Sequence, residues 1–111
     1  MAFSPDGTTL ATGHYDGEIR LWNAQTGELR QVIPTDGVVE SLAFSPDGSV
    51  LASGESTGSN QVRLWDIEIG QLVRILDSHG NPLESLAFSP DGRLLASGSV
   101  DGTVWLWGLR P

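Results

Sequence analysis

The sequence Ala-Phe-Ser-Pro-Asp-Gly occurs three times, at residues 2–7, 43–48 and 87–92. Consecutive copies start 41 and 44 residues apart. Each copy is followed by a Leu-Trp pair, at 21–22, 64–65 and 106–107. Self-similarity at a fixed period indicates that one supersecondary unit is used repeatedly, and it decides the architecture before any single residue is considered.

Turn residues separate short apolar runs within each repeat. In Ser-Pro-Asp-Gly, Pro presets φ for the second turn position and Gly accepts a positive φ. The apolar runs lack a helical period, and Leu and Trp of each Leu-Trp pair face opposite ways in a strand. In the middle repeat we expect four strands, at Val39–Ser45, Val50–Ser53, Gln61–Asp66 and Gln71–Leu76. Antiparallel strands at a period in the low forties are typical of β-propeller blades.

The repeats predict one partial propeller with units at about 1–37, 38–80 and 81–111. About eleven strands are expected, one fewer than three four-stranded blades need. A closed propeller has roughly four to eight blades. The expected fold is therefore all-β and incomplete, either an open arc or part of a larger ring. We expect a fragment of a longer protein, with a segment that self-assembles into a homo-oligomeric ring as the alternative.

Composition excludes several function classes. The chain has a formal charge of −8 and contains neither Lys nor Cys. An acidic surface repels phosphate backbones, so no nucleic-acid partner is expected. Without Lys there is no phosphate-loop lysine, and without Cys no thiolate metal site. No stretch approaches the roughly 18 apolar residues of a membrane span, and no signal peptide is recognisable. We expect a cytoplasmic protein without a membrane partner or a cofactor.

The sequence resembles the WD-repeat β-propeller family, in the regular form common in bacterial repeat proteins. The resemblance covers essentially the whole chain. The Trp-Asp signature that ends the third strand is literal at Trp65-Asp66, whereas Trp22-Asn23 and Trp107-Gly108 keep only the Trp. The resemblance implies a non-catalytic scaffold that binds a protein or peptide. A sensor or regulatory domain of a larger enzyme is a further alternative.

Blades of this family often contain a hydrogen-bonded tetrad of His, Ser or Thr, Asp and Trp. By resemblance, the third repeat has all four members, which are His79, Ser97, Asp101 and Trp107. The other repeats have partial tetrads, consisting of Thr12, Asp16 and Trp22 in the first and of Ser53 and Trp65 in the second. We expect His14 to be an isolated surface residue.

Two patterns suggest catalysis, and both have simpler explanations. Residues 54–58 match the G-x-S-x-G hydrolase motif, but that motif needs a strand-to-helix turn and the repeats place a strand-to-strand turn here. His79, Ser97 and Asp101 also have the residue types of a catalytic triad. The tetrad, however, explains these three residues together with Trp107. No enzyme activity is therefore predicted.

A calcium site is the other chemistry that the repeats suggest. Asp6, Asp47 and Asp91 recur, one in each repeated turn. Each is the only acid of its turn, whereas calcium needs about six or more oxygen ligands. We therefore predict turn chemistry at these positions and no metal site.

WD-repeat propellers usually bind proteins through the loops before the first strand and between the second and third strands. Carried over by position, this predicts a binding face of Tyr15, Val38, Glu40, Pro82, Glu84 and Val100. Glu40 and Glu84 occupy matching positions, so two carboxylates would suit a basic partner. The simpler explanation is that both are ordinary solvated charges. Trp105 replaces the Arg of the other repeats and is a candidate edge contact with a following blade or a partner.

Overall fold

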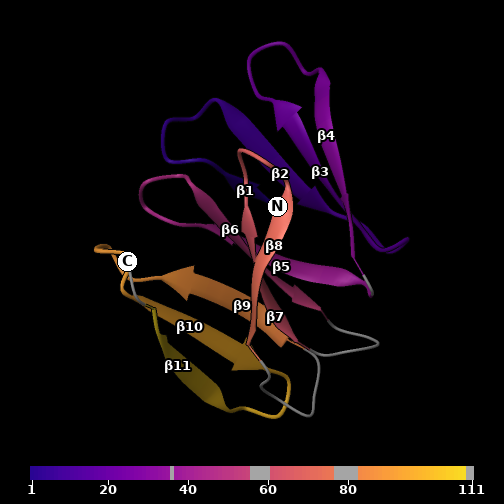
Figure 1. The fold of residues 1–111 in the computed structure, drawn as a ribbon. Coiled ribbons are helices and arrows are strands. Elements are labelled where there is room, and N and C mark those ends of the chain that lie inside the picture. The colour runs from indigo at the N-terminus through magenta and orange to yellow at the C-terminus, as the bar shows by residue number, and fades with distance from the viewer. Residues whose placement is uncertain (36, 56–60, 77–82, 110–111) are drawn as a thin grey trace.

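The computed structural model describes residues 1–35, 37–55, 61–76 and 83–109, and Figure 1 shows that they form three stacked sheets. The first sheet contains β1 (Ala2–Phe3), β2 (Thr9–Gly13), β3 (Glu18–Asn23) and β4 (Leu29–Pro34). The second contains β5 (Val39–Phe44), β6 (Val50–Glu55), β7 (Val62–Asp66) and β8 (Gln71–Leu76). The third contains β9 (Leu83–Phe88), β10 (Leu94–Ser99) and β11 (Val104–Gly108).

All strand pairs are antiparallel, and each sheet is a meander of consecutive strands. The prediction of an all-β chain with incomplete propeller blades is confirmed. Three expected boundaries of the middle repeat differ: β5 ends and β7 begins one residue inside the expected range, and β6 continues past Ser53, because Gly54 and Glu55 still pair with β5. The described residues contain no helix that is long and apolar enough to cross a membrane.

The repeated Ser-Pro-Asp-Gly segment is a turn that joins the first two strands of each sheet. In the second sheet the Ser45 hydroxyl donates to Asp47 Oδ1 at 2.7 Å, and the Ser49 N–H donates to the same oxygen at 3.0 Å. Gly48 has a φ of +76°, a backbone conformation that Gly adopts without steric cost. The Ser-to-Asp hydrogen bond recurs at 2.7 Å in the first sheet and 2.6 Å in the third. The contacts agree with the turn chemistry predicted for the three Asp.

Neighbouring sheets pack face to face and form two apolar clusters. Ile19 and Leu21 of the first sheet pack against Trp65 of the second. Leu64 of the second sheet packs against Leu95 of the third in the same way. Strand β7 is therefore buried on both faces. Val62 and Leu64 lie on one face, and Arg63 and Trp65 lie on the other. The middle sheet is the core of the molecule, because it alone among the described sheets has a neighbour on each side.

Candidate protein-binding face

Two kinds of loop meet at one end of the sheets. The turn at residues 14–17 joins β2 to β3, and residues 35–38 lead from β4 into β5. The Thr35 N–H donates to the Gly17 carbonyl at 2.7 Å, and the Val39 N–H donates to the His14 carbonyl at 3.5 Å. These backbone hydrogen bonds hold the second-to-third-strand loop of one sheet against the entry to the next sheet. The Ser-Pro-Asp-Gly turns lie at the opposite ends of the same strands.

Apolar side chains are exposed on this face. Tyr15 is 84% exposed within the 14–17 turn, and Val100 is exposed in the equivalent turn before β11. The Asp101 carboxylate closes that turn by accepting hydrogen bonds from the Thr103 N–H at 2.9 Å and the Thr103 hydroxyl at 2.6 Å. Val38 is half-buried at the entry to β5. Pro82 lies outside the described residues.

Glu40 and Glu84 each lie at an irregularity of the inner strand. The β5–β6 register slips at Glu40, and the β9–β10 register slips in the same way opposite Glu84. A bulge changes the direction of a side chain near the end of a strand. Both side chains are exposed, and neither carboxylate has a hydrogen bond or ion pair to another described residue. Because β5 and β9 lie side by side, two carboxylates are presented from matching positions of neighbouring sheets.

A Trp in the third strand of each sheet donates its indole N–H to a hydroxyl on the second strand. The bonds are Trp22 to Thr12 at 2.8 Å, Trp65 to Ser53 at 2.9 Å, and Trp107 to Ser97 at 3.1 Å. A buried indole N–H needs an acceptor, and a hydroxyl supplies one. The structure thus brings together the Trp and the Ser or Thr of each expected tetrad. His79 lies outside the described residues.

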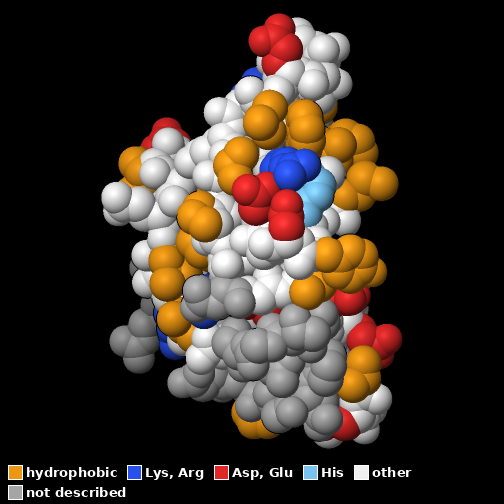
Figure 2. Space-filling model, turned by 90° about the vertical axis from the view of Figure 1, so that its right-hand side faces the viewer, with side chains coloured by type: hydrophobic (Ala, Val, Ile, Leu, Met, Phe, Trp, Pro, Cys, Tyr) orange, Lys and Arg blue, Asp and Glu red, His pale blue; other side chains and the backbone are white. Residues whose placement is uncertain are grey.

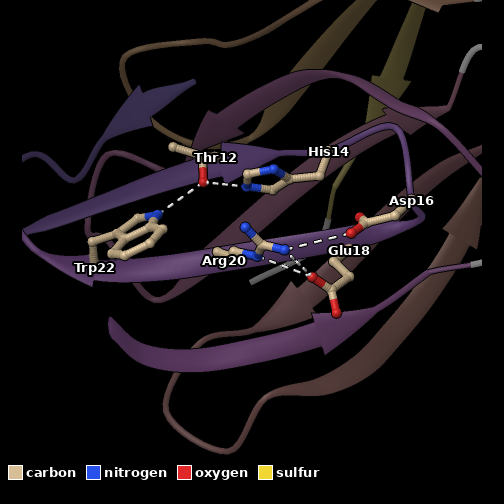
Figure 3. Close-up of polar contacts among 6 residues, drawn as sticks. All are labelled: Thr12, His14, Asp16, Glu18, Arg20 and Trp22. Carbon is tan, nitrogen blue, oxygen red and sulfur yellow. Dashed lines mark hydrogen bonds and ion pairs between the residues drawn. The ribbon is translucent and has the colours of Figure 1, made fainter. Parts of the chain in front are cut away.

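His14 takes the place of a tetrad His in the first sheet. Its Nε2 lies 2.8 Å from Thr12 Oγ1, the same oxygen that accepts the Trp22 indole N–H, as Figure 3 shows. The expectation that His14 is an isolated surface residue is wrong. His14 follows Thr12 by two positions, and side chains two apart lie on one face of a strand. Asp16 is not part of this group, because its carboxylate pairs with Arg20 at 3.4 Å.

The middle sheet has an ion pair at the corresponding position. Glu55 follows Ser53 by two positions, as His14 follows Thr12. Its Oε1 lies 2.8 Å from Arg63 Nε, and the two side chains are 0% and 9% exposed. The match of residues 54–58 to the hydrolase motif gives no indication of this pair. The two-residue spacing from the strand hydroxyl was the signal that could have identified it.

Trp105 stacks on Trp107, with ring centroids 5.7 Å apart and ring planes 21° from parallel. The two residues lie on the same face of β11, and Trp107 packs toward the second sheet. Trp105 is therefore directed away from the side on which a following blade would lie. Val104 and Leu106 are the β11 residues on that side.

The described residues contain no metal-binding cluster. No group of three or more His, Asp or Glu side chains among them is arranged to hold a metal ion. A groove of about 680 Å³ between the second and third sheets lies at the Ser-Pro-Asp-Gly end. Arg74 and Arg93 line it together with Asp47 and Asp91, so its charges are mixed and favour neither sign of ligand.

Stacked antiparallel sheets, each with a Trp-to-hydroxyl bond and the same turn, define consecutive β-propeller blades. The family described as "WD domain, G-beta repeat" matches residues 1–23, 27–66 and 70–108. The chain therefore belongs to the WD-repeat family. The matched segment 27–66 contains β4 of the first sheet as well as β5–β7 of the second, so a sequence repeat bridges two blades.

Similar proteins come from several eukaryotes. Transducin beta-like protein 3 of Bos taurus is 33% identical over 80 residues, which are 71% of this chain and 10% of that protein. The periodic tryptophan protein 2 homolog of Dictyostelium discoideum is 52% identical over 27 residues, 24% of this chain and 3% of that protein. Apoptotic protease-activating factor 1 of Homo sapiens is 64% identical over 28 residues, 25% of this chain and 2% of that protein. The matched segments span a tenth or less of these proteins.

Proposed function

We propose that this chain is a non-catalytic protein-interaction scaffold that binds a basic protein or peptide segment through Glu40 and Glu84. Membership of the WD-repeat family supports a role in protein–protein contacts. A basic partner is proposed because two exposed carboxylates lie at matching strand irregularities. No described residue already pairs with either carboxylate. An incoming Arg or Lys therefore displaces only water and does not have to break an existing ion pair.

Electrostatics and nearby apolar groups favour this choice. The formal charge of −8 attracts cationic segments over distances up to the Debye length of about 8 Å at physiological salt. Tyr15 and Val100 add exposed apolar surface in the β2–β3 and β10–β11 turns at the same end of the sheets. Tyr is enriched in protein interfaces, where its ring contributes buried area and its hydroxyl a hydrogen bond. A basic segment with apolar neighbours fits this face.

The non-catalytic part of the proposal rests on Ser97. Its side chain is fully buried, and its hydroxyl oxygen accepts the indole N–H of Trp107. A catalytic nucleophile needs access to its substrate and an adjacent base. Ser97 instead joins two strands of one blade, which is a structural role.

The test is direct binding of short peptides that carry two Arg at varied spacing, measured by calorimetry at physiological salt. We expect at least one spacing to bind the wild-type chain, and the double variant Glu40→Gln/Glu84→Gln to bind about tenfold more weakly. A tenfold change corresponds to about 1.4 kcal/mol of binding free energy, which the loss of two charge-assisted hydrogen bonds can readily account for.

The matched control is Glu28→Gln/Glu68→Gln, which removes the same charge from exposed positions in the β3–β4 and β7–β8 turns. We expect this control to bind the peptide like the wild type. Equal weakening by both double variants would show that only net charge matters, and unchanged binding by Glu40→Gln/Glu84→Gln would rule out the proposed face.

A further inference from the structure

The third sheet has an apolar face that no described residue covers. The β10–β11 register places Ala96 opposite Leu106 and Val104 opposite Gly98, so these side chains share one face. Val104 and Leu106 are 70% and 69% exposed, and Leu94 beside them is also exposed. Large side chains of this kind are rarely left together in contact with water without a partner.

The same residue types are buried in the other two sheets. The equivalents of Ala96, Val104 and Leu106 are Ala11, Ile19 and Leu21 in the first sheet and Ala52, Val62 and Leu64 in the second. All six are at most 6% exposed, because the next sheet covers them. The exposed face of the third sheet therefore has the composition of a sheet-to-sheet interface.

The first sheet has the complementary face at the other end of the molecule. Inside the chain, the face that receives each apolar trio contains Phe44, Leu51 and Trp65 in the second sheet and Phe88, Leu95 and Trp107 in the third. The equivalents in the first sheet are Phe3, Leu10 and Trp22, which pair across β1, β2 and β3. Phe3 is 63% exposed, whereas Phe44 and Phe88 are partly buried against a neighbouring sheet.

We propose that two copies of this chain dock head to tail, with the Val104 and Leu106 face of one copy on the Phe3 and Trp22 face of the other. The partner is a second copy because one chain carries both halves of an interface that it already uses twice internally. The contact is heterologous, so it either closes into a ring or continues as an open chain. Two copies supply six blade-like sheets, within the range of roughly four to eight in closed propellers.

Charged groups on the first sheet are compatible with this docking. Arg20 lies beside Asp16 and Glu18, with His14 nearby, as Figure 3 shows; Figure 2 shows a cluster of these residue types surrounded by hydrophobic side chains. Arg63 is the equivalent of Arg20 at the internal interface, where it is paired with Glu55 and nearly fully buried. A paired Arg is thus already tolerated at this place between two sheets. Arg20 is 32% exposed because none of the described sheets lies against its side of the first sheet.

The experiment measures molar mass by light scattering at tens of micromolar for three chains and one mixture. We expect the wild type to have the mass of two or more chains, and Leu106→Glu and Phe3→Glu each to have the mass of one chain. Each substitution places a carboxylate on one face only, and burying it unpaired lowers the association constant by at least about tenfold. An equimolar mixture of the two variants is expected to form a dimer, because one intact pair of faces remains.

The control is Ile69→Glu, which changes an equally exposed apolar residue in the β7–β8 turn, away from both end faces. Its mass is expected to equal that of the wild type, and circular dichroism checks that every variant is folded. A wild type with the mass of one chain would overturn the proposal. A mixture that stays monomeric would also overturn it, since head-to-tail docking requires the variants to complement each other.

Discussion

At the scale of single residues, the repeated turn uses each of its side chains for a separate task. The Ser45 hydroxyl donates to Asp47 and accepts from the Val50 N–H at 3.1 Å, so it joins the turn to the next strand. The hydrogen bond from Ser45, followed by those from Ser49, lowers the pKa of Asp47 to about 2. The pKa of Asp6 is lowered to about 2 in the same way, and that of Asp91 is also lowered. The ionised form of each Asp therefore stabilises its turn.

This has a consequence at acid pH. The folded pKa of Asp47 lies below its ordinary value of 3.8, so its contribution to stability is complete above about pH 4 and is lost as pH falls toward 2. We expect the Tm of the wild type to fall between pH 5 and pH 2. The fall should be a few degrees smaller in Asp47→Asn, which has no charge to lose. Thermal melts by circular dichroism provide the measurement, and parallel curves for the two proteins would contradict the assignment.

At the scale of elements, the end of the second strand differs from blade to blade. The position two residues after the strand hydroxyl holds His14 directly after β2, Glu55 at the end of β6, and Ser99 at the end of β10. His14 joins the Thr12 hydroxyl, whereas Glu55 pairs with Arg63 across the strands. The blades therefore share a backbone meander but contain different polar groups. In the middle blade the Glu55 carboxylate is buried and lies 2.8 Å from Arg63 Nε.

Removing Glu55 should be costly. Glu55→Ala leaves the Arg63 guanidinium buried without this counter-ion, and breaking a buried pair in this way costs about 3–5 kcal/mol of unfolding free energy. Replacing both residues, as in Glu55→Leu/Arg63→Met, should recover most of that loss, because no buried charge is left. Urea unfolding measures the difference. The partly exposed pair of Glu18 and Arg20 offers a control: Glu18→Ala should cost less than about 1 kcal/mol of unfolding free energy.

If Glu55→Leu/Arg63→Met were as unstable as Glu55→Ala, the buried charge would not be the source of the effect. In that case, loss of volume in the packed middle blade would explain both results.

At the scale of the whole molecule, close packing between blades limits side-chain size. A Cβ added to Gly13 would lie 2.5 Å from Val39 Cγ1 and 2.9 Å from the Val39 carbonyl oxygen, both in the next sheet. A Cβ at Gly108 of β11 would have no neighbour within 4 Å, because it points to an uncovered part of the third sheet. The two strand positions thus differ in tolerance, because a neighbouring sheet lies against Gly13 and none of the described residues lies against Gly108.

We therefore expect Gly13→Ala to lower the unfolding free energy by about 1–3 kcal/mol, the usual cost of overpacking. Gly108→Ala should change it by less than about 0.5 kcal/mol, as surface substitutions usually do. Chemical denaturation of the two variants checks this. Equal losses would mean that backbone propensity, which is changed identically in both, is responsible.

Much of the fold could be predicted from local sequence. The repeated turn and the alternation along each strand depend on residues within a few positions of one another, so the sheets and most strand boundaries followed from them. The Trp-to-hydroxyl bonds also follow from a repeated strand spacing. The geometry of the proposed binding face was harder to predict, because the strand irregularities at Glu40 and Glu84 depend on pairing with a partner strand.

By itself, the sequence determined the strands, the turns and the family, because these depend on backbone preferences and on a period that recurs along the chain. Only the tertiary structure decided which identical-looking side chains are buried. Leu21, Leu64 and Leu106 occupy one position of the repeat, yet only Leu106 is exposed. Arg63 is buried and Arg20 is not for the same reason. Burial depends on whether another sheet lies against that face, and a local sequence pattern does not indicate whether such a sheet is present.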